Sequence, residues 1–339
     1  MAVGVKNIIN EDAESICSKI DFSALDGKTI LISGASGLLG VYFITCLKLL
    51  NEQGLNIKTV AVFRSELPDY LLQGEFANLQ IFKGDITDYE FCKSLPKADF
   101  IVHAAGYGQP MKFMDEPEKT LKLNTFSTFL LFDKLNKGGR FLFVSSSEVY
   151  SGLDAQVYTE EQIGNTNTSH PRACYIEGKR GGEAICYAYS TKGLSASSVR
   201  LAHTYGPGTK KGDKRVILSF IEKALQGQIQ MLDDGKALRT YCYIADAVEI
   251  MWHILLKGTQ NVYNLGGNSQ TSIAGLAQNI GKIMNVPVIV PASTQSVSGA
   301  PADVQLDMTR VRTEFGKTDY ISLNEGLERT INWYLDINT

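Results

Sequence analysis

A tyrosine and a lysine four residues apart are the first residues in this chain whose spacing suggests chemistry. Tyr175 and Lys179 lie in the segment 174–191, whose apolar residues recur with helical spacing. Residues four apart share one face of a helix, so the phenol and the ammonium can lie side by side. A neighbouring ammonium favours the phenolate, and we expect it to lower the pKa of Tyr175 toward the neutral range that suits a general base. A pair with this spacing also occurs by chance on solvated helix surfaces.

A polar run follows the apolar segment 140–145, which we expect to be a buried strand. Residues 145–148 read Ser-Ser-Ser-Glu, so Ser146, Ser147 and Glu148 come where the strand ends. In α/β folds this edge of the sheet carries the reactive groups. Turn formation by the serines and helix capping by Glu148 are the structural alternatives.

A glycine turn near the start of the chain predicts a dinucleotide site. The apolar segment 29–32 leads into Gly34, Gly37 and Gly40, and the helical pattern 38–50 follows. In a strand, turn and helix of this kind the glycines permit a tight turn, close approach to a diphosphate and close packing of helix on strand. Three glycines in an ordinary turn between strand and helix would look similar.

Strands alternate with helices through the first two thirds of the chain. The order predicts βαβ units and therefore a doubly wound parallel α/β sheet. We expect strands at 29–32, 58–63, 79–82, 100–103, 140–145 and 196–200, and helices at 38–50, 88–95, 119–136 and 174–191. The segment 1–27 should form a short docking helix.

After about residue 204 the alternation decays and a smaller lobe is expected. Its helices should span 216–226, 244–256, 272–284 and 324–335, with a strand near 261–264. We therefore divide the chain into an extension (1–27), a dinucleotide-binding Rossmann domain (28–203) and a lobe (204–339) from which 240–265 returns to the first domain. The lobe would close a cleft over the carboxyl ends of the strands.

Composition gives little reason to expect other partners. The chain has 339 residues, 44% of them apolar and 20% charged, and a net charge of −3. These values are those of a globular cytoplasmic protein that binds neither nucleic acid nor a membrane. Six scattered cysteines and four scattered histidines predict reduced thiols and no metal site.

Taken together, the motifs resemble the extended short-chain dehydrogenase/reductases, specifically the NAD-dependent epimerase/dehydratase family. The resemblance runs from about residue 28 to the C-terminus, and within the family the segments 171–189 and 214–227 look most like UDP-glucuronate decarboxylases. It is carried by GASGLLG (34–40), KGDITD (83–88), HAAG (103–106), LKLNT (121–125), SSSEVY (145–150), YIEGK (175–179), RLAHTYGPG (200–208) and LRTYCYIADA (238–247).

The resemblance implies roles for these residues. Tyr175 would take the proton from a sugar hydroxyl, usually that on C4, Lys179 would hold the nicotinamide ribose, and Ser146 would bond the reacting oxygen. Ser147 and Glu148 would serve the later step at C5 and C6. The implied cofactor contacts are Gly34, Ser36, Gly37, Leu38, Leu39, Gly40, Asp85, Ile86, Ala104, Ala105 and Asn124, and the implied contacts of a UDP- or dTDP-linked sugar are His203, Arg215 and Arg239.

The cofactor expectation is NAD, because a retained and recycled cofactor need not match the reducing pool. Arg64 leaves NADP open, since it stands where an acidic residue would grip the ribose of NAD and an arginine accommodates a 2′-phosphate. We also expect a homodimer, formed through the helices 119–136 and 174–191 as in the family.

The reaction is less specified. Ser147-Glu148 favours decarboxylation, and 4,6-dehydration ranks second because the acid for a leaving hydroxyl is missing. Epimerisation at C4 ranks third, since it leaves Glu148 without a task. The segment 299–301, Gly-Ala-Pro, stands where decarboxylases carry an arginine, so either another residue, with Arg172 and Arg215 as candidates, binds the carboxylate or the substrate is not an acid. An NADPH-dependent ketone reductase and a non-catalytic dinucleotide sensor are the alternatives from other classes.

Overall fold

Seven parallel strands form the main sheet of the protein. The computed structural model describes residues 5–72, 76, 78–291 and 305–337, so the segment 299–301 lies outside the described residues. The strand order is β10-β6-β5-β4-β1-β2-β3, which confirms the doubly wound α/β class. The strands are β1 (Thr29–Ser33), β2 (Lys58–Phe63), β3 (Leu79–Lys83), β4 (Ala98–His103), β5 (Leu135–Ser146), β6 (Ser195–Leu201) and β10 (Val262–Leu265).

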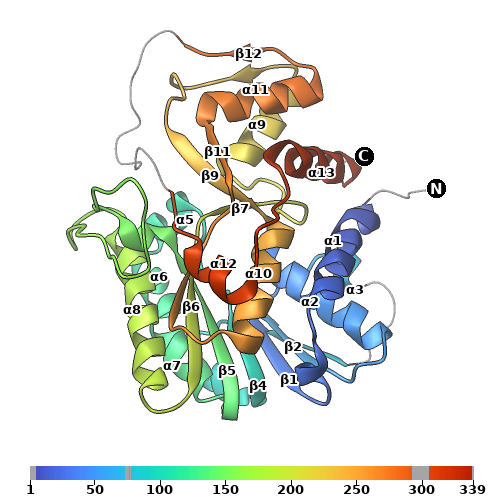
Figure 1. The fold of residues 1–339 in the computed structure, drawn as a ribbon, viewed down its shortest axis with the longest axis vertical. Coiled ribbons are helices and arrows are strands. Elements are labelled where there is room, and N and C mark those ends of the chain that lie inside the picture. The colour runs from blue at the N-terminus through green and yellow to red at the C-terminus, as the bar shows by residue number, and fades with distance from the viewer. Residues whose placement is uncertain (1–4, 73–75, 77, 292–304, 338–339) are drawn as a thin grey trace.

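Alternate residues of the central strands face opposite layers of helices. In β1, Ile30 and Ile32 belong to one buried cluster and Leu31 to the other, as the two-residue period of a strand requires. α2 (Leu38–Glu52) and α10 (Ile244–Lys257) cover the first face, with α3 (Asp69–Leu72) beside α2. The second face is covered by α4 (Tyr89–Ser94), α6 (Pro117–Asn124), α7 (Phe126–Phe132) and α8 (Ala173–Ser190) (Figure 1).

The single helix expected at 119–136 is wrong. α6 ends at Asn124, α7 begins at Phe126, and residues 135 and 136 already belong to β5. Hydroxyl groups explain the break, because Thr125 donates to the carbonyl of Leu121 at 2.8 Å and Ser127 to that of Leu123 at 2.5 Å. Side chains that bond the carbonyl four residues back destabilise and bend a helix.

A smaller lobe lies over the carboxyl ends of the strands of the main sheet (Figure 1). It contains a three-stranded sheet, β11 (Ser269–Ser272), β9 (Leu238–Tyr243) and β7 (His203–Tyr205), and a parallel pair, β12 (Val288–Ile289) and β8 (Ile229–Gln230). Its helices are α9 (Val216–Ala224), α11 (Ile273–Met284) and α13 (Leu323–Asp336), while α12 (Thr309–Phe315) packs on β10 and α10. The strand near 261–264 is confirmed as β10, which joins the main sheet; the division of the chain at residue 203 stays a prediction.

The N-terminal segment forms the expected docking helix. α1 (Val5–Lys19), followed by the short turn η1 (Ser23–Leu25), packs on α2, α10 and α13. Its buried Asp12 accepts hydrogen bonds from Tyr42 at 2.7 Å and Tyr243 at 2.8 Å, and Arg329 donates to it at 2.9 Å. These three residues come from three different elements, so α1 ties the main sheet's helices to the small lobe.

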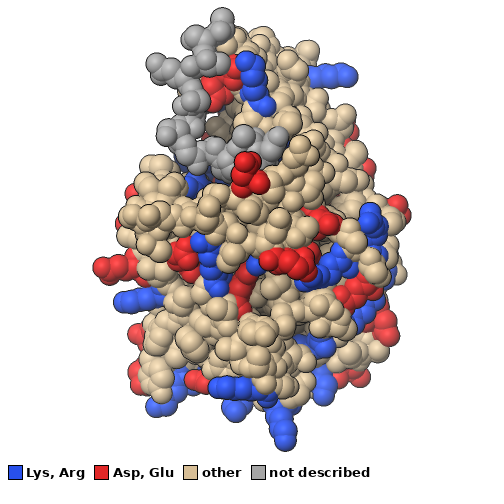
Figure 2. All heavy atoms as spheres, turned by 60° about the vertical axis from the view of Figure 1, so that its left-hand side comes forward, with Lys and Arg blue, Asp and Glu red and all other residues tan. Residues whose placement is uncertain are grey.

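Charges of both signs are mixed on one face of the molecule. On the face shown in Figure 2, Lys and Arg side chains are interspersed with Asp and Glu side chains. Among the described residues, no helix combines the length and apolarity that crossing a membrane requires. The described part of the chain also holds no group of three or more His, Cys, Asp or Glu side chains placed to bind a metal ion.

Candidate functional site

The carboxyl ends of the strands open into a large cleft beneath the small lobe. Its cavity volume is about 1010 Å³. It is lined by the glycine turn, the ends of β2, β4 and β5, the start of α8 and the loop after β7. This is the crevice in which doubly wound folds bind their ligands.

The glycine turn fits a dinucleotide. Gly34 has φ +75°, and a Cβ there would lie 2.7 Å from the backbone of Ala104 and Ala105; one at Gly40 would lie 2.5 Å from the carbonyl oxygen of Gly34. Side chains are thus excluded at both positions, and α2 begins directly after Gly37. The amino end of α2 therefore faces the cleft, as diphosphate binding requires.

A buried, unsatisfied amide lies at the floor of the same region. Asn124 donates from Nδ2 to the carbonyl of Thr120 at 2.7 Å, but its Oδ1 has no hydrogen-bond partner among the described residues. A Cβ on Gly106 would be 3.8 Å from this oxygen and 3.5 Å from Nζ of Lys179. A buried acceptor beside a lysine fits a ligand with hydroxyl donors, such as a ribose.

Ser146, Tyr175 and Lys179 come together on the cleft wall. Ser146 ends β5 and caps the short helix η2 (Ser147–Tyr150), accepting a hydrogen bond from the amide of Glu148 at 3.2 Å. Lys179 is 5% exposed, donates to the carbonyl of Val144 at 2.7 Å, and places Nζ 5.6 Å from the centroid of the Tyr175 ring. The i, i+4 pair therefore faces the end of β5, where Ser146 lies near enough to Tyr175 to lower its pKa.

The expectation that Lys179 lowers the pKa of Tyr175 is wrong. Burial raises the pKa of Tyr175 to about 12, and the hydrogen bond with Ser146 offsets only part of that shift. The Phe113 ring from α5 (Pro110–Asp115) stacks on Tyr175 with 4.5 Å between centroids and contributes to its enclosure. The ammonium of Lys179 bonds a main-chain carbonyl instead of the phenol, so its charge does not overcome desolvation.

Burial also lowers the pKa of Lys179, from its ordinary value of 10.5 to about 7. The unfolded chain then binds more protons at this lysine between these two values, so its contribution to stability rises with pH across that window and is fully unfavourable below it. We expect Lys179→Met to raise the unfolding temperature of the nucleotide-free protein at pH 7, and the gain to shrink toward pH 10.5.

Thermal unfolding of Lys179→Met and of wild type at a series of pH values checks this prediction. Lys192→Met, an exposed lysine beyond the end of the same helix, is the control and should show no such trend. A lower midpoint for Lys179→Met at every pH would contradict the prediction.

Glu148 and Arg172 form an ion pair inside the cleft. The guanidinium binds the carboxylate through Nε at 3.0 Å and through Nη2, a two-point geometry that fixes both groups. Arg172 also lies over the Phe113 ring, 5.3 Å from its centroid. Arg172 therefore fixes the Glu148 side chain close to Ser146. The sequence motifs did not predict this pairing.

Three arginines gather around His203. Desolvation in the cleft, together with the charges of Arg239, Arg215 and Arg172, lowers the pKa of His203 to about 4. Arg215 forks onto Asp213 at 2.8 to 3.1 Å, and Arg239 is buried and donates to the carbonyl of Leu238 at 2.6 Å. This wall of the cleft is thus neutral at His203 and electropositive around it, which suits a phosphorylated or carboxylated ligand.

The sequence motifs predicted the lining of the cleft well. Every candidate residue lines it except Asn124, which lies below the wall beside Gly106. The motifs did not predict Phe113, Ser65 and Lys210, because each acts through a partner distant in sequence. Lys210, for example, bonds a residue 145 positions away, and no local pattern signals such a contact.

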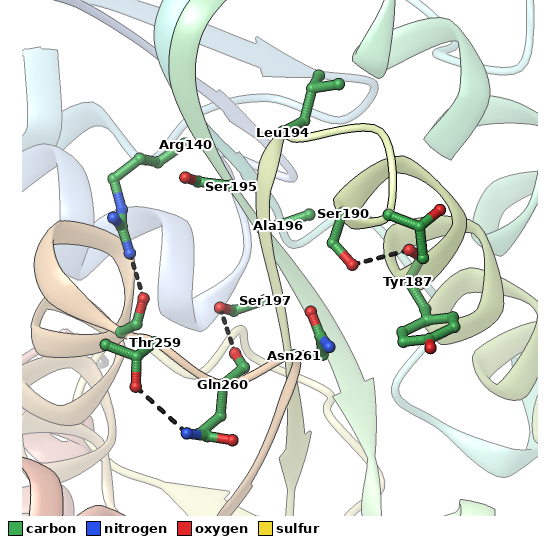
Figure 3. A pocket seen from close by; sticks show the side chains of 12 residues that line it. Arg140, Tyr187, Ser190, Leu194, Ser195, Ala196, Ser197, Thr259, Gln260 and Asn261 are labelled. Carbon is green, nitrogen blue, oxygen red and sulfur yellow. Dashed lines mark hydrogen bonds between the residues drawn. The ribbon is translucent and has the colours of Figure 1, made fainter.

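A second pocket, of about 440 Å³, lies at the amino ends of the strands, away from the cleft. It surrounds the start of β6 and the loop after α10 (Figure 3). Its polar groups bond one another: Arg140 donates to the carbonyl of Gly258 at 2.5 Å and Ser197 to that of Gln260 at 2.8 Å. It shares no residue with the cleft.

Comparison with known proteins identifies relatives of the same family and fold. The chain is 29% identical to UDP-glucuronic acid decarboxylase 1 of Xenopus tropicalis over 92% of its own length and 73% of the relative. Its fold is similar to UDP-glucose 4-epimerase of Thermotoga maritima (TM-score 0.77, 24% identity, 92% and 100% of the two chains covered). It is also similar to dTDP-glucose 4,6-dehydratase of Bacillus anthracis (TM-score 0.73, 21% identity, 91% and 96% covered). Residues 30–266 match the sequence pattern of the NAD dependent epimerase/dehydratase family, so the chain belongs to that family.

Proposed function

We propose that the protein oxidises a nucleotide sugar at C4, modifies the neighbouring carbon and reduces C4 again, with no net consumption of cofactor. The observation that supports this best is the grouping of Ser146, Tyr175 and Lys179 beside the glycine turn in one cleft. A bound nicotinamide would accept a hydride from C4 and return it at the end of the cycle.

The protein's own residues supply the proton chemistry. Tyr175 takes the proton of the C4 hydroxyl as the hydride leaves, and Ser146 donates to the same oxygen. In the ligand-free structure burial raises the pKa of Tyr175 to about 12. Its activation therefore needs the Lys179 ammonium to turn from the Val144 carbonyl toward the phenol and ribose, a shift that binding at the orphaned Asn124 oxygen would favour.

Decarboxylation of UDP-glucuronate is the reaction that we place first. With a ketone at C4, the C6 carboxylate leaves as carbon dioxide, the electron pair of the C5–C6 bond forms an enolate with the C4 carbonyl, and C5 then takes up a proton. No acid is needed for a leaving hydroxyl. Three arginines lie around His203, and two of them already hold carboxylates, Arg172 that of Glu148 and Arg215 that of Asp213. Arg172 is the candidate for the carboxylate, because it binds the Glu148 carboxylate through two donors, and the substrate carboxylate would displace Glu148 from it. The Xenopus tropicalis decarboxylase supports the same choice.

Two other outcomes remain in the same proposal. 4,6-Dehydration of a dTDP- or UDP-hexose ranks second, since Ser147 stands where an acid would protonate the departing hydroxyl. Epimerisation at C4 ranks third, because it leaves Glu148 and its arginine without a role. A dissociable NADPH-dependent ketone reductase is favoured by Arg64 alone.

The experiment is to incubate the enzyme separately with UDP-glucuronate, UDP-glucose and dTDP-glucose and to weigh the products. Loss of carbon dioxide from UDP-glucuronate is the expected result. Loss of water from a hexose would put dehydration first, and an unchanged mass with inverted C4 would put epimerisation first. Inertness toward all three would contradict the proposed substrate class.

We also propose a homodimer and predict that it forms through α6, α7 and α8. Part of the apolar set on these helices is buried within the chain, including Leu130 and Ile185. Others stay exposed and mark an unpartnered surface, namely Leu121 (39%), Phe126 (42%), Phe129 (47%) and Tyr187 (58%).

Light scattering at micromolar concentration should give twice the mass of the chain. The double variant Phe126→Glu, Phe129→Glu should be monomeric, because it would place charges in the contact. Leu232→Glu is the control, since Leu232 is 84% exposed but lies in the small lobe. A monomeric wild type would refute the dimer.

A further inference from the structure

A buried ion pair joins α8 to β6 beneath the wall of the cleft. Glu183 of α8 is 8% exposed and Arg200 of β6 is 4% exposed. Arg200 donates through Nε at 3.0 Å and through Nη2 at 2.8 Å to the Glu183 carboxylate, a two-point contact that fixes both groups. Its Nη1 bonds the Tyr150 hydroxyl at 2.8 Å and the carbonyls of Glu160 and Gln162. The proposed reaction gives neither partner of this pair a role.

The carboxylate of Glu183 also holds the carboxyl end of β5. The hydroxyl of Ser145 donates to Oε1 of Glu183 at 2.5 Å, and Ser145 lies beside Arg200 in the register of β5 and β6. Lys179 donates to the carbonyl of Val144, the residue before Ser145. Lys179 and Glu183 are one helical turn apart, so two neighbouring side chains of α8 bond two successive residues of β5.

Polar side chains from three elements lie around the Lys179 ammonium, namely Asn124 of α6, His103 of β4, and Tyr175 and Glu183 of α8. Burial lowers the pKa of His103 to about 3 and raises that of Tyr175 to about 12, so both are neutral at pH 7. Of these four described side chains, only Glu183 is then charged. Burial lowers the pKa of Lys179, and the Glu183 carboxylate offsets part of that shift, because a nearby negative charge favours the ammonium.

We propose that Glu183 is a positioning residue for the oxidation at C4, and that its buried carboxylate keeps Lys179 in the ammonium form. The inference rests on the proposed function, since it concerns the step in which Tyr175 takes the C4 proton and the nicotinamide takes the hydride. Glu183 does not line the cleft, so it acts through Lys179 and touches neither substrate nor cofactor.

The test is the pH dependence of the initial reduction of the nicotinamide by the cofactor-loaded protein, with UDP-glucuronate, UDP-glucose and dTDP-glucose as probes. Glu183→Gln keeps the size of the side chain but loses its charge, so Lys179 should lose its proton at lower pH. The alkaline limb of the rate profile should therefore move down by about one pH unit. The rate at pH 8 should fall about tenfold relative to wild type and recover toward pH 6, while the apparent affinity for the sugar nucleotide stays within about twofold.

A second variant separates this effect from loss of the fold. Glu183→Gln leaves the Arg200 guanidinium buried without its carboxylate, which is strongly destabilising, whereas replacing both members of a buried pair is well tolerated. The double variant Glu183→Gln, Arg200→Met should therefore unfold at a higher temperature than Glu183→Gln and still show the shifted profile. Glu183→Asp, which keeps the charge, should keep the alkaline limb of wild type.

Glu177→Gln is the matched control, because Glu177 lies on the same helix, pairs with Arg180 and does not line the cleft. It should keep the wild-type profile. A wild-type alkaline limb in the double variant would overturn the inference and leave the proposed function standing, as would a rate that falls by the same factor at every pH. Failure of wild type to reduce its nicotinamide with any of the three sugar nucleotides would overturn both.

Discussion

Tyr175→Phe should lower the rate of product formation by about a hundredfold or more, the usual scale for a positioned acid–base group. The change removes one oxygen from a side chain that Phe113 already encloses at 4.5 Å, so the fold and the cofactor site should be unaffected. The reason for the loss is specific: without the phenol, no group on the cleft wall takes the C4 proton while Ser146 donates to the same oxygen.

Two measurements separate this effect from a structural one. The affinity for the dinucleotide should stay within about tenfold of wild type, since the phenol contributes one hydrogen bond at most. Tyr187→Phe, a substitution of a 58% exposed tyrosine on the same helix, should be fully active. Activity of Tyr175→Phe within a few-fold of wild type would remove Tyr175 from the mechanism.

Glu148→Gln should have the second largest effect and should divide the reaction into its steps. The amide keeps the size of the side chain but loses the charge that pairs with Arg172. We expect product formation to fall by about a hundredfold, while oxidation at C4 continues because Tyr175, Lys179 and Ser146 are intact. Reduced nicotinamide should therefore build up on the enzyme after addition of substrate.

Single-turnover absorbance of the nicotinamide, together with product analysis, checks this expectation. Glu161→Gln is the control, because Glu161 also pairs with an arginine but is 69% exposed and lies outside the cleft. Wild-type turnover in Glu148→Gln would contradict a role after C4 oxidation. Loss of oxidation itself would assign Glu148 to the first step instead.

The alternation of strands and helices was predictable because buried parallel strands are continuous apolar runs. The strand expected at 58–63 is β2 to the residue, and the expected helix 174–191 differs from α8 by one residue at each end. The prediction of one helix over 119–136 was wrong because apolar spacing takes no account of hydroxyls that bond the helix backbone. The two-residue strands β8 and β12 exist only through each other, and such pairing leaves no local pattern.

The candidate site, too, was predictable only where it depends on short sequence motifs. Residues that belong to compact motifs, such as Tyr175 and the glycine turn, line the cleft as expected. Which side chains contact each other could not be predicted from the sequence. Arg172 binds Glu148, and burial outweighs the ammonium at Tyr175; both depend on distances that only the fold determines.

The central claim is that C4 is oxidised and reduced again within one catalytic cycle. The most direct test is to follow the absorbance of reduced nicotinamide during steady-state turnover of UDP-glucuronate while product is quantified in the same sample. Our account predicts many turnovers per enzyme molecule with no net change in reduced nicotinamide beyond the enzyme-bound amount. Consumption or release of one reduced nicotinamide for each product molecule would contradict it.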